Sequence, residues 1–200
     1  MLAPTVGGCP AGAAAADPAA GAGYGTRMTA HPRIVTVRDP DGRSVFALLT
    51  RQRLPIRPEQ VFPFFADAHN LERITPPFLR FRVLTPRPIA MAEGTLIEYR
   101  LRLHGLPIRW LTRIAVWQPP HRFVDEQLRG PYRLWRHEHS FEPDGAGGTL
   151  ARDHVEYQIR GGEALGSVAN RLLVARDLER IFSYRAGRIC RASTRPTRNR

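Results

Sequence analysis

The sequence contains no lysine, since all thirty basic residues are arginine, and with eighteen acidic residues they give a net charge of +12. Such a charge suits a nucleic-acid-binding protein. However, half of the excess lies in residues 185–200, which hold six arginines and no acid. Arginine without lysine, beside abundant Ala, Pro and Gly, indicates a GC-rich genome. We therefore expect no specific nucleic-acid partner, and only a weak contact of this Arg-rich segment with anionic membranes.

Cysteine is scarce, and long apolar runs are missing. The two cysteines, Cys9 and Cys190, lie near the ends of the chain, so a disulfide framework is excluded and a reducing compartment is expected. No stretch of eighteen apolar residues occurs, so no membrane span is expected. The N-terminal residues lack a basic start followed by an apolar run, which argues against a secretory signal. We expect a cytoplasmic protein.

The length of 200 residues suits one domain with flanking segments. Residues 1–43 are rich in Ala, Gly and Pro, a composition that predicts a disordered leader, and Met28 is a second candidate for the start of translation. The folded domain is expected over residues 44–188, followed by a disordered Arg-rich tail over residues 189–200.

The spacing of apolar residues predicts the order of the elements. Residues 45–54 predict a strand, and residues 58–67 and 68–74 predict two short helices. Period-two alternation then predicts six strands, over residues 78–85, 94–104, 108–118, 122–128, 132–142 and 149–159. Residues 163–185 predict a long amphipathic helix, whose apolar face needs a partner. The predicted fold is α+β, with a seven-stranded antiparallel sheet wrapped around this helix.

The segment RLWRHEHSFEP, residues 133–143, places two histidines around a glutamate within a predicted strand. Side chains on a strand alternate between its two faces, so Trp135, His137, His139 and Phe141 share one face. The two large aromatic side chains mark that face as the inner one. Both imidazoles are therefore expected to point inward, and Glu138 outward.

This order of elements is the helix-grip arrangement, and the sequence resembles the SRPBCC superfamily of START lipid-binding, pollen-allergen-like and polyketide cyclase/dehydrase-like proteins. The resembling segments are RPEQVFPFFADAHNLERITPP (residues 57–77), FVDEQLRGPYRLWRHEHSFEP (123–143) and GGTLARDHVEYQIR (147–160). The similarity covers about residues 45–188 and is closest to a bacterial subgroup. It implies a deep cavity between sheet and C-terminal helix for a lipid, an isoprenoid or an aromatic polyketide. The superfamily shares no invariant catalytic motif, so the resemblance assigns no catalytic residue.

Strand alternation, with one residue from the last helix, supplies the candidate ligand-binding residues. They are Tyr99, Leu101, Trp110, Thr112, Phe123, Asp125, Gln127, Trp135, His137, His139, Phe141, Asp153, Val155, Tyr157 and Leu172. Apolar side chains dominate, as in most small-molecule pockets. Asp125 faces inward only if Phe123 does, and Val124 and Leu128 favour the opposite register.

Several roles remain open for His137, His139 and Asp153, with Asp125 as a further member of the group. They can satisfy one another's hydrogen bonds, orient a ligand's polar head, or transfer protons as acid and base. A metal site is least favoured because its third ligand must come from Asp153 or Asp125, and we predict neither metal nor cofactor. Binding of a small hydrophobic molecule without chemistry is the first expectation. A cofactor-independent polyketide cyclase or dehydratase and a membrane-associated lipid carrier are the alternatives, and the oligomeric state stays open.

Overall fold

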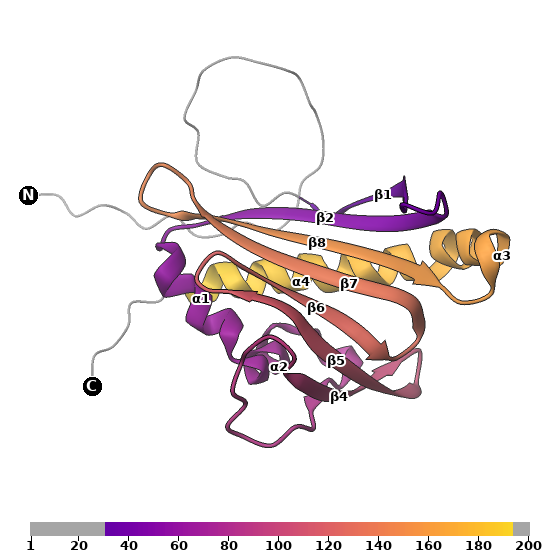
Figure 1. Ribbon diagram of the computed structural model, residues 1–200, viewed down its shortest axis with the longest axis horizontal. Coiled ribbons are helices and arrows are strands. Elements are labelled where there is room, and N and C mark those ends of the chain that lie inside the picture. Colours follow the sequence, from indigo (N-terminus) through magenta and orange to yellow (C-terminus); the bar gives the residue numbers. More distant parts are fainter. Residues whose placement is uncertain (1–30, 194–200) are drawn as a thin grey trace, which may run out of the picture.

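The computed structural model describes residues 31–193, apart from the side chains of residues 162–165, 192 and 193. An antiparallel sheet of eight strands curves over one side of a long C-terminal helix, α4 (Ala175–Ser193), as Figure 1 shows. The strands are β1 (Arg33–Arg38), β2 (Ser44–Leu54), β3 (Arg82–Val83), β4 (Leu96–Leu103), β5 (Leu106–Gln118), β6 (Arg122–Arg129), β7 (Tyr132–Pro143) and β8 (Thr149–Ile159). Their order in the sheet is β1-β2-β8-β7-β6-β5-β4-β3.

Short helices follow β2 and fill one end of the sheet, while the C-terminal helical segment starts at the other end (Figure 1). The helices before the long one are α1 (Pro58–Ala66), η1 (Ala68–Asn70), α2 (Leu71–Ile74), η2 (Pro77–Leu79), α3 (Gly162–Ala169) and the π-helical turn η3 (Asn170–Val174). The predicted α+β helix-grip fold is thereby confirmed. Within residues 31–193, no helix combines the length and apolarity needed to span a membrane.

The outer boundaries of the domain differ from those predicted. Strand β1 lies inside the predicted leader and pairs with β2 along its whole length, so the sheet has eight strands rather than seven. The long helix continues to Ser193, past the predicted start of the Arg-rich tail. The rest of the leader, residues 1–30 with Cys9 and Met28, lies outside the described residues, as do residues 194–200.

The π-helical turn η3 changes which residues of the last helical segment face the sheet. A turn with i→i+5 hydrogen bonds holds one residue more than an α-helical turn, so it rotates the residues before it relative to those after it. Leu178 and Phe182, beyond η3, are buried as the spacing predicted. Val168 and Leu172 are 50% and 54% exposed. The predicted inward position of Leu172 is therefore wrong.

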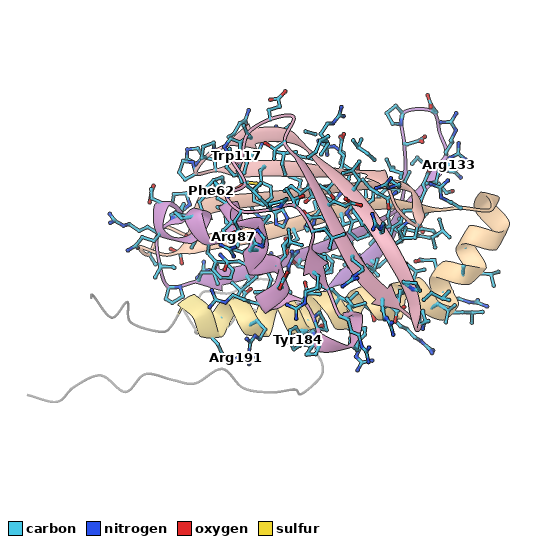
Figure 2. The ribbon with its side chains drawn as sticks, turned by 90° about the horizontal axis from the view of Figure 1, so that it is seen from below. Phe62, Arg87, Trp117, Arg133, Tyr184 and Arg191 are labelled. Carbon is cyan, nitrogen blue, oxygen red and sulfur yellow. The ribbon has the colours of Figure 1, made fainter. Side chains whose placement is uncertain are left out.

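Aromatic side chains pack the concave face of the sheet against α1 and α4. Phe62 of α1 contacts Trp117, Phe123 and Phe141, with ring centroids 5.2, 6.1 and 5.7 Å away. Figure 2 labels Phe62 and Trp117 at the end of the sheet where α1 lies, with α4 running beneath. Aromatic pairs at such separations add to the free energy gained by burial. They fix α1 against the sheet and so position one end of the interior.

Candidate functional site

A cavity of about 200 Å³ lies inside the fold, walled by strands β4 to β7 on one side and by α2 and α4 on the other. The candidate residues that the structure brings to its wall are Tyr99, Leu101, Trp110, Thr112, Phe123, Asp125, Trp135, His137 and His139. Other apolar side chains come from the helices, among them Phe65, Leu71 and Ile181. The volume far exceeds what one buried water needs, so the fold leaves room for a small molecule.

The remaining candidates lie outside the wall. Phe141, Val155 and Tyr157 are fully buried in packing, and the Tyr157 hydroxyl donates to Asn170 Oδ1 over 2.8 Å. Leu172 lies on the surface, for the reason given above. Asp153 lies behind the wall, in contact with both imidazoles.

Gln127 stabilises the turn between β6 and β7 and does not line the cavity. Its Nε2 donates to Tyr132 O over 2.8 Å, and Tyr132 N donates to its Oε1 over 3.3 Å. A Cβ atom at Gly130 would lie 2.2 Å from the same Oε1, so only glycine leaves room for this side chain. Alternation places Gln127 on the face of β6 that includes Asp125, but it does not show that the turn uses both ends of its amide.

We expect Gly130→Ala to displace Gln127 and lower the free energy of unfolding by about 1–2 kcal/mol, because two hydrogen bonds are lost. Gln127→Ala should cost a similar amount. The double variant should cost little more than Gln127→Ala, since the clash disappears with the amide. Urea unfolding of the three variants measures these changes in stability. If the double variant loses the sum of the two single losses, Gly130 and Gln127 act independently and the expected clash is contradicted.

The polar part of the wall is a cluster of two imidazoles between two carboxylates, contributed by three neighbouring strands. Asp125 of β6 pairs in register with His137 of β7, and His139 pairs with Asp153 of β8. His137 Nε2 donates to Asp153 Oδ1 over 3.1 Å, and Thr50 Oγ1 donates to Asp153 Oδ2 over 2.8 Å. His137 Nδ1 and His139 Nε2 each lie 3.6 Å from Asp125 Oδ2.

The contact of His139 with Asp153 is close but poorly directed. His139 Nδ1 lies 2.9 Å from Asp153 Oδ1, yet it makes no hydrogen bond and is fully buried. The two imidazole rings lie with centroids 3.8 Å apart and are tilted by 39°, and only His137 makes a hydrogen bond to Asp153 Oδ1. We therefore treat this contact as electrostatic attraction rather than a hydrogen bond.

The environment separates the pKa values of the four groups. Burial lowers the pKa of His137 to about 4, helped by repulsion from His139. Burial alone would also lower the pKa of His139, but its contacts with Asp125 and Asp153 outweigh this effect and raise it. Burial would raise the pKa of both carboxyl groups, yet the imidazoles hold Asp125 below and Asp153 well below the usual value. At neutral pH His137 is therefore neutral and both carboxyl groups are ionised, while His139 is the imidazole of the pair that binds a proton more readily.

Arg185 and Thr50 belong to the surroundings of the cluster but were not among the candidates. Arg185 of α4 lines the cavity, with Nη1 3.9 Å from Asp153 Oδ1 and its guanidinium 5.3 Å from the Phe182 ring centre. The helical spacing could have predicted that Arg185 faces the cavity, because residues 178, 182 and 185 share one face of the helix. Thr50 of β2 pairs in register with Asp153, which no period in the sequence reveals.

The edge of the cavity is bridged by a contact between a hairpin and the last helix. His104 lies in the turn between β4 and β5, and its Nε2 is 2.7 Å from Asp177 Oδ2 of α4. Asp177 lines the cavity, as do Leu103 and Ile108 on either side of that turn. The partner of Asp177 lies on a distant strand pair, so sequence spacing could not reveal this contact.

Three side chains of the cluster offer donor atoms of the types that bind metal ions. One ligand atom from each of Asp125, His137 and His139 lies within 4.8 Å of the other two. Two imidazoles and one carboxylate suit a divalent transition metal. Asp125 rather than Asp153 supplies the third donor, because Asp153 lies behind the rings.

The comparisons with known proteins agree with this architecture. The sequence profile of the family described as polyketide cyclase / dehydrase and lipid transport matches residues 54–181. No curated protein matches the chain by sequence.

Solved structures share the fold at low identity. The Zhui aromatase/cyclase from Streptomyces sp. R1128 is 16% identical, with a TM-score of 0.61 over 77% of this chain and 96% of its own. Protein Ms6760 from Mycobacterium smegmatis is 18% identical, with a TM-score of 0.55 over 81% and 98%. Ara h 8.0201 is 14% identical, with a TM-score of 0.52 over 72% and 97%. With the family profile covering most of the described domain, the chain belongs to the polyketide cyclase/dehydrase and lipid transport family, within the SRPBCC superfamily.

Proposed function

We propose that the protein binds a small hydrophobic or amphipathic molecule, such as an aromatic polyketide, an isoprenoid or a lipid, in the cavity between sheet and α4. The observation that carries this proposal is the wall itself, which is mostly apolar and includes the cluster of Asp125, His137 and His139. Apolar burial supplies affinity at roughly 25 cal/mol per Å². The few polar groups in such a pocket fix the ligand's orientation.

The cluster sets the chemistry of the ligand's polar end. The Asp125 carboxylate lies on the wall and can accept a hydrogen bond from a ligand hydroxyl. The imidazole of His139 can donate one to a carbonyl or phenolate oxygen. A molecule with an apolar body and one oxygen-bearing end fits both requirements. The model ligand 2-naphthol has this chemistry and is fluorescent.

Blocking the cavity from either wall should remove binding of 2-naphthol. We expect Leu101→Trp in β4 and Ile181→Trp in α4 each to weaken binding at least tenfold, because the larger side chain occupies the ligand's volume. Leu96→Trp is the matched control, since Leu96 lies on the same strand but is exposed. Fluorescence titration measures affinity, and circular dichroism verifies the fold. Equal affinity in the blocked variants and the control would contradict the proposal.

Proton-transfer catalysis is the second candidate function, favoured by the position of the acid–base groups on the cavity wall. His137, His139 and Asp125 all line the cavity, so each can reach a bound poly-β-ketone. A base would take a proton from a carbon between two carbonyls, the carbanion would attack a third carbonyl, and the imidazolium would protonate the new oxygen. Loss of water would complete an aldol dehydration without a cofactor.

The two functions differ in the response to imidazole replacement. If the cluster only orients a ligand, His139→Gln should weaken 2-naphthol binding by a few fold, with no turnover of a poly-β-ketone in either protein. If it transfers protons, the unmodified protein should cyclise the poly-β-ketone and His139→Gln should lose at least 100-fold of that rate while binding persists. Product analysis by mass spectrometry separates these outcomes.

The bridge between His104 and Asp177 should slow exchange of the ligand. We expect Asp177→Asn to accelerate dissociation of 2-naphthol about two- to fivefold, because a partly exposed pair contributes only about 0.2–1 kcal/mol. Stopped-flow fluorescence measures the rate. Glu142→Gln, which removes an ion pair with Arg152 elsewhere on the surface, is the control and should leave the rate unchanged. Equal rates in all three proteins would show that the ligand leaves by another path.

A further inference from the structure

We propose that Asp125, His137 and His139 form a binding site for a divalent transition-metal ion of the zinc type. The three side chains come from neighbouring strands and converge on one point of the cavity wall. His137 Nδ1 and His139 Nε2 both lie 3.6 Å from the same oxygen, Asp125 Oδ2. The inference deepens the proposed function and rests on it for the role of the ion, which is to hold the polar end of the ligand.

The spacing fits a tetrahedral ion with little rearrangement. Zinc binds imidazole nitrogen and carboxylate oxygen at about 2.0–2.2 Å, so two ligand atoms of a tetrahedral site lie roughly 3.4 Å apart. The 3.6 Å separations differ from this by a few tenths of an ångström. All three ligand atoms lie within 4.8 Å of one another, so the two imidazole nitrogens need to approach no more than about 1.4 Å to reach the tetrahedral separation.

The remaining contacts of the cluster resemble the outer shell of a metal site. His137 donates through Nε2 to Asp153, which leaves the lone pair of Nδ1 directed at Asp125. Thr50 in turn donates to Asp153 and fixes that carboxylate. Metal-bound histidines are usually oriented in this way by a carboxylate on the far side of the ring. Asp153 is thus a positioning residue rather than a ligand.

The two imidazoles of the proposed site are buried and lie among charged groups. The side chains of His137 and His139 are only 5% and 4% exposed, and His139 Nδ1 is buried without a hydrogen-bond partner. Two carboxylates flank the imidazoles, and the nearby guanidinium of Arg185 approaches Asp153, at 3.9 Å. A divalent ion bound here would displace any proton on His139 Nε2 and take over its contact with Asp125.

The proposed site would leave one coordination position open to the cavity. Catalytic zinc sites have three protein ligands and a fourth coordination position that faces the substrate. Because all three residues line the cavity, that position faces the space where the ligand is proposed to lie. The ligand class is therefore narrowed to molecules with an oxygen donor at one end, such as an enolate, a β-dicarbonyl or a phenolate.

Cobalt(II) titration of the metal-stripped protein tests this site, because its visible absorption is much more intense in four-coordinate than in six-coordinate sites. We expect one ion per chain, intense absorption, and loss of that absorption when zinc is added. Asp125→Asn and His137→Gln should each weaken cobalt binding at least tenfold. Asp153→Asn should weaken it about 10–100-fold, as replacement of an outer-shell partner does. His154→Gln is the control, because His154 lies on β8 away from the cavity wall and its side chain is 41% exposed.

The metal proposal and the proposed function can fail separately. Binding of 2-naphthol to the metal-stripped protein, together with weak octahedral-type absorption that is equal in all variants, would overturn the metal site and leave the ligand cavity. Four-coordinate absorption that depends on Asp125 and His137, without 2-naphthol binding in either form, would support the metal site and refute the ligand proposal. Thermal unfolding of each variant shows whether it is folded.

Discussion

Replacing Asp153 by alanine is expected to lower the free energy of unfolding by about 3–5 kcal/mol at pH 7. The carboxylate accepts hydrogen bonds from His137 and Thr50 and lies 2.9 Å from His139 Nδ1. Its loss leaves two buried imidazoles with only Asp125 as a carboxylate partner, and it leaves the Thr50 hydroxyl without its acceptor. Removing one partner of a buried charge pair costs far more than removing an exposed one. Urea unfolding of the metal-stripped protein measures the effect.

An exposed carboxylate provides the control for this measurement. Asp41 also pairs with an arginine, Arg43, at 2.6 Å, but its side chain is 66% exposed. We expect Asp41→Ala to change stability by less than about 1 kcal/mol. Asp153→Asn should lie between the two, because the amide oxygen still accepts one hydrogen bond. Equal stabilities for Asp153→Ala and Asp41→Ala would show that the cluster does not stabilise the fold.

Acidification from pH 6.5 to 4 is expected to destabilise the metal-stripped protein by about 3 kcal/mol through His137 alone. The pKa of this histidine falls from 6.5 in the unfolded chain to about 4 in the folded protein. Below pH 6.5 the unfolded chain therefore binds a proton that folded His137 does not, and each unit of separation corresponds to about 1.4 kcal/mol. Stability is thus lost progressively as pH falls through this window.

The neighbouring groups do not reverse this sign. The raised pKa of His139 contributes stability that is fully present below pH 6.5 and is lost only as pH rises through its folded value. The lowered pKa values of Asp125 and Asp153 contribute stability that is lost only below about pH 4. His137→Gln should therefore show a flatter stability profile between pH 6.5 and 4. Parallel profiles for the two proteins, measured by urea unfolding, would contradict the assignment of the neutral ring.

The inward direction of the two imidazoles could be predicted because β7 keeps a strict period of two. Large aromatic residues at positions 135 and 141 mark the inner face, and no bulge interrupts residues 135–141. The register of Asp125 could not be decided in the same way. Phe123 and Val124 are both buried, although they point to opposite faces of β6. Apolar character therefore did not distinguish the two faces of this strand.

Side chains that cover the outer face explain why Val124 is buried. Arg113 and Arg136 reach Glu126, and Arg122 reaches Glu138, so ion pairs lie on the outside of β6 and β7. Long arginine side chains cover apolar surface with their methylene groups while their charges stay in water. A valine beneath them is buried without facing the core, and only the three-dimensional arrangement reveals this.

The other differences arise from features that leave no periodic signal. The π-helical turn η3 shifts the helical phase at residues 170–174 and moves Leu172 to the surface. Contacts between distant elements, such as Arg185 with Asp153 and His104 with Asp177, depend on how α4 lies against the sheet. Local spacing therefore predicted the fold class and the cavity-facing strands, while the partners of each polar side chain required the structure.

Long-range ¹H–¹⁵N NMR of the imidazole rings during titration with 2-naphthol tests the central claim most directly. A ligand in the cavity must touch a wall that includes His137 and His139, whereas His121 and His154 do not line it. The predicted result is a saturable change in the ring nitrogens of His137 and His139, with His121 and His154 unchanged. Binding that shifts only His121 or His154, or that shifts no imidazole, would place the ligand elsewhere and contradict the proposed site.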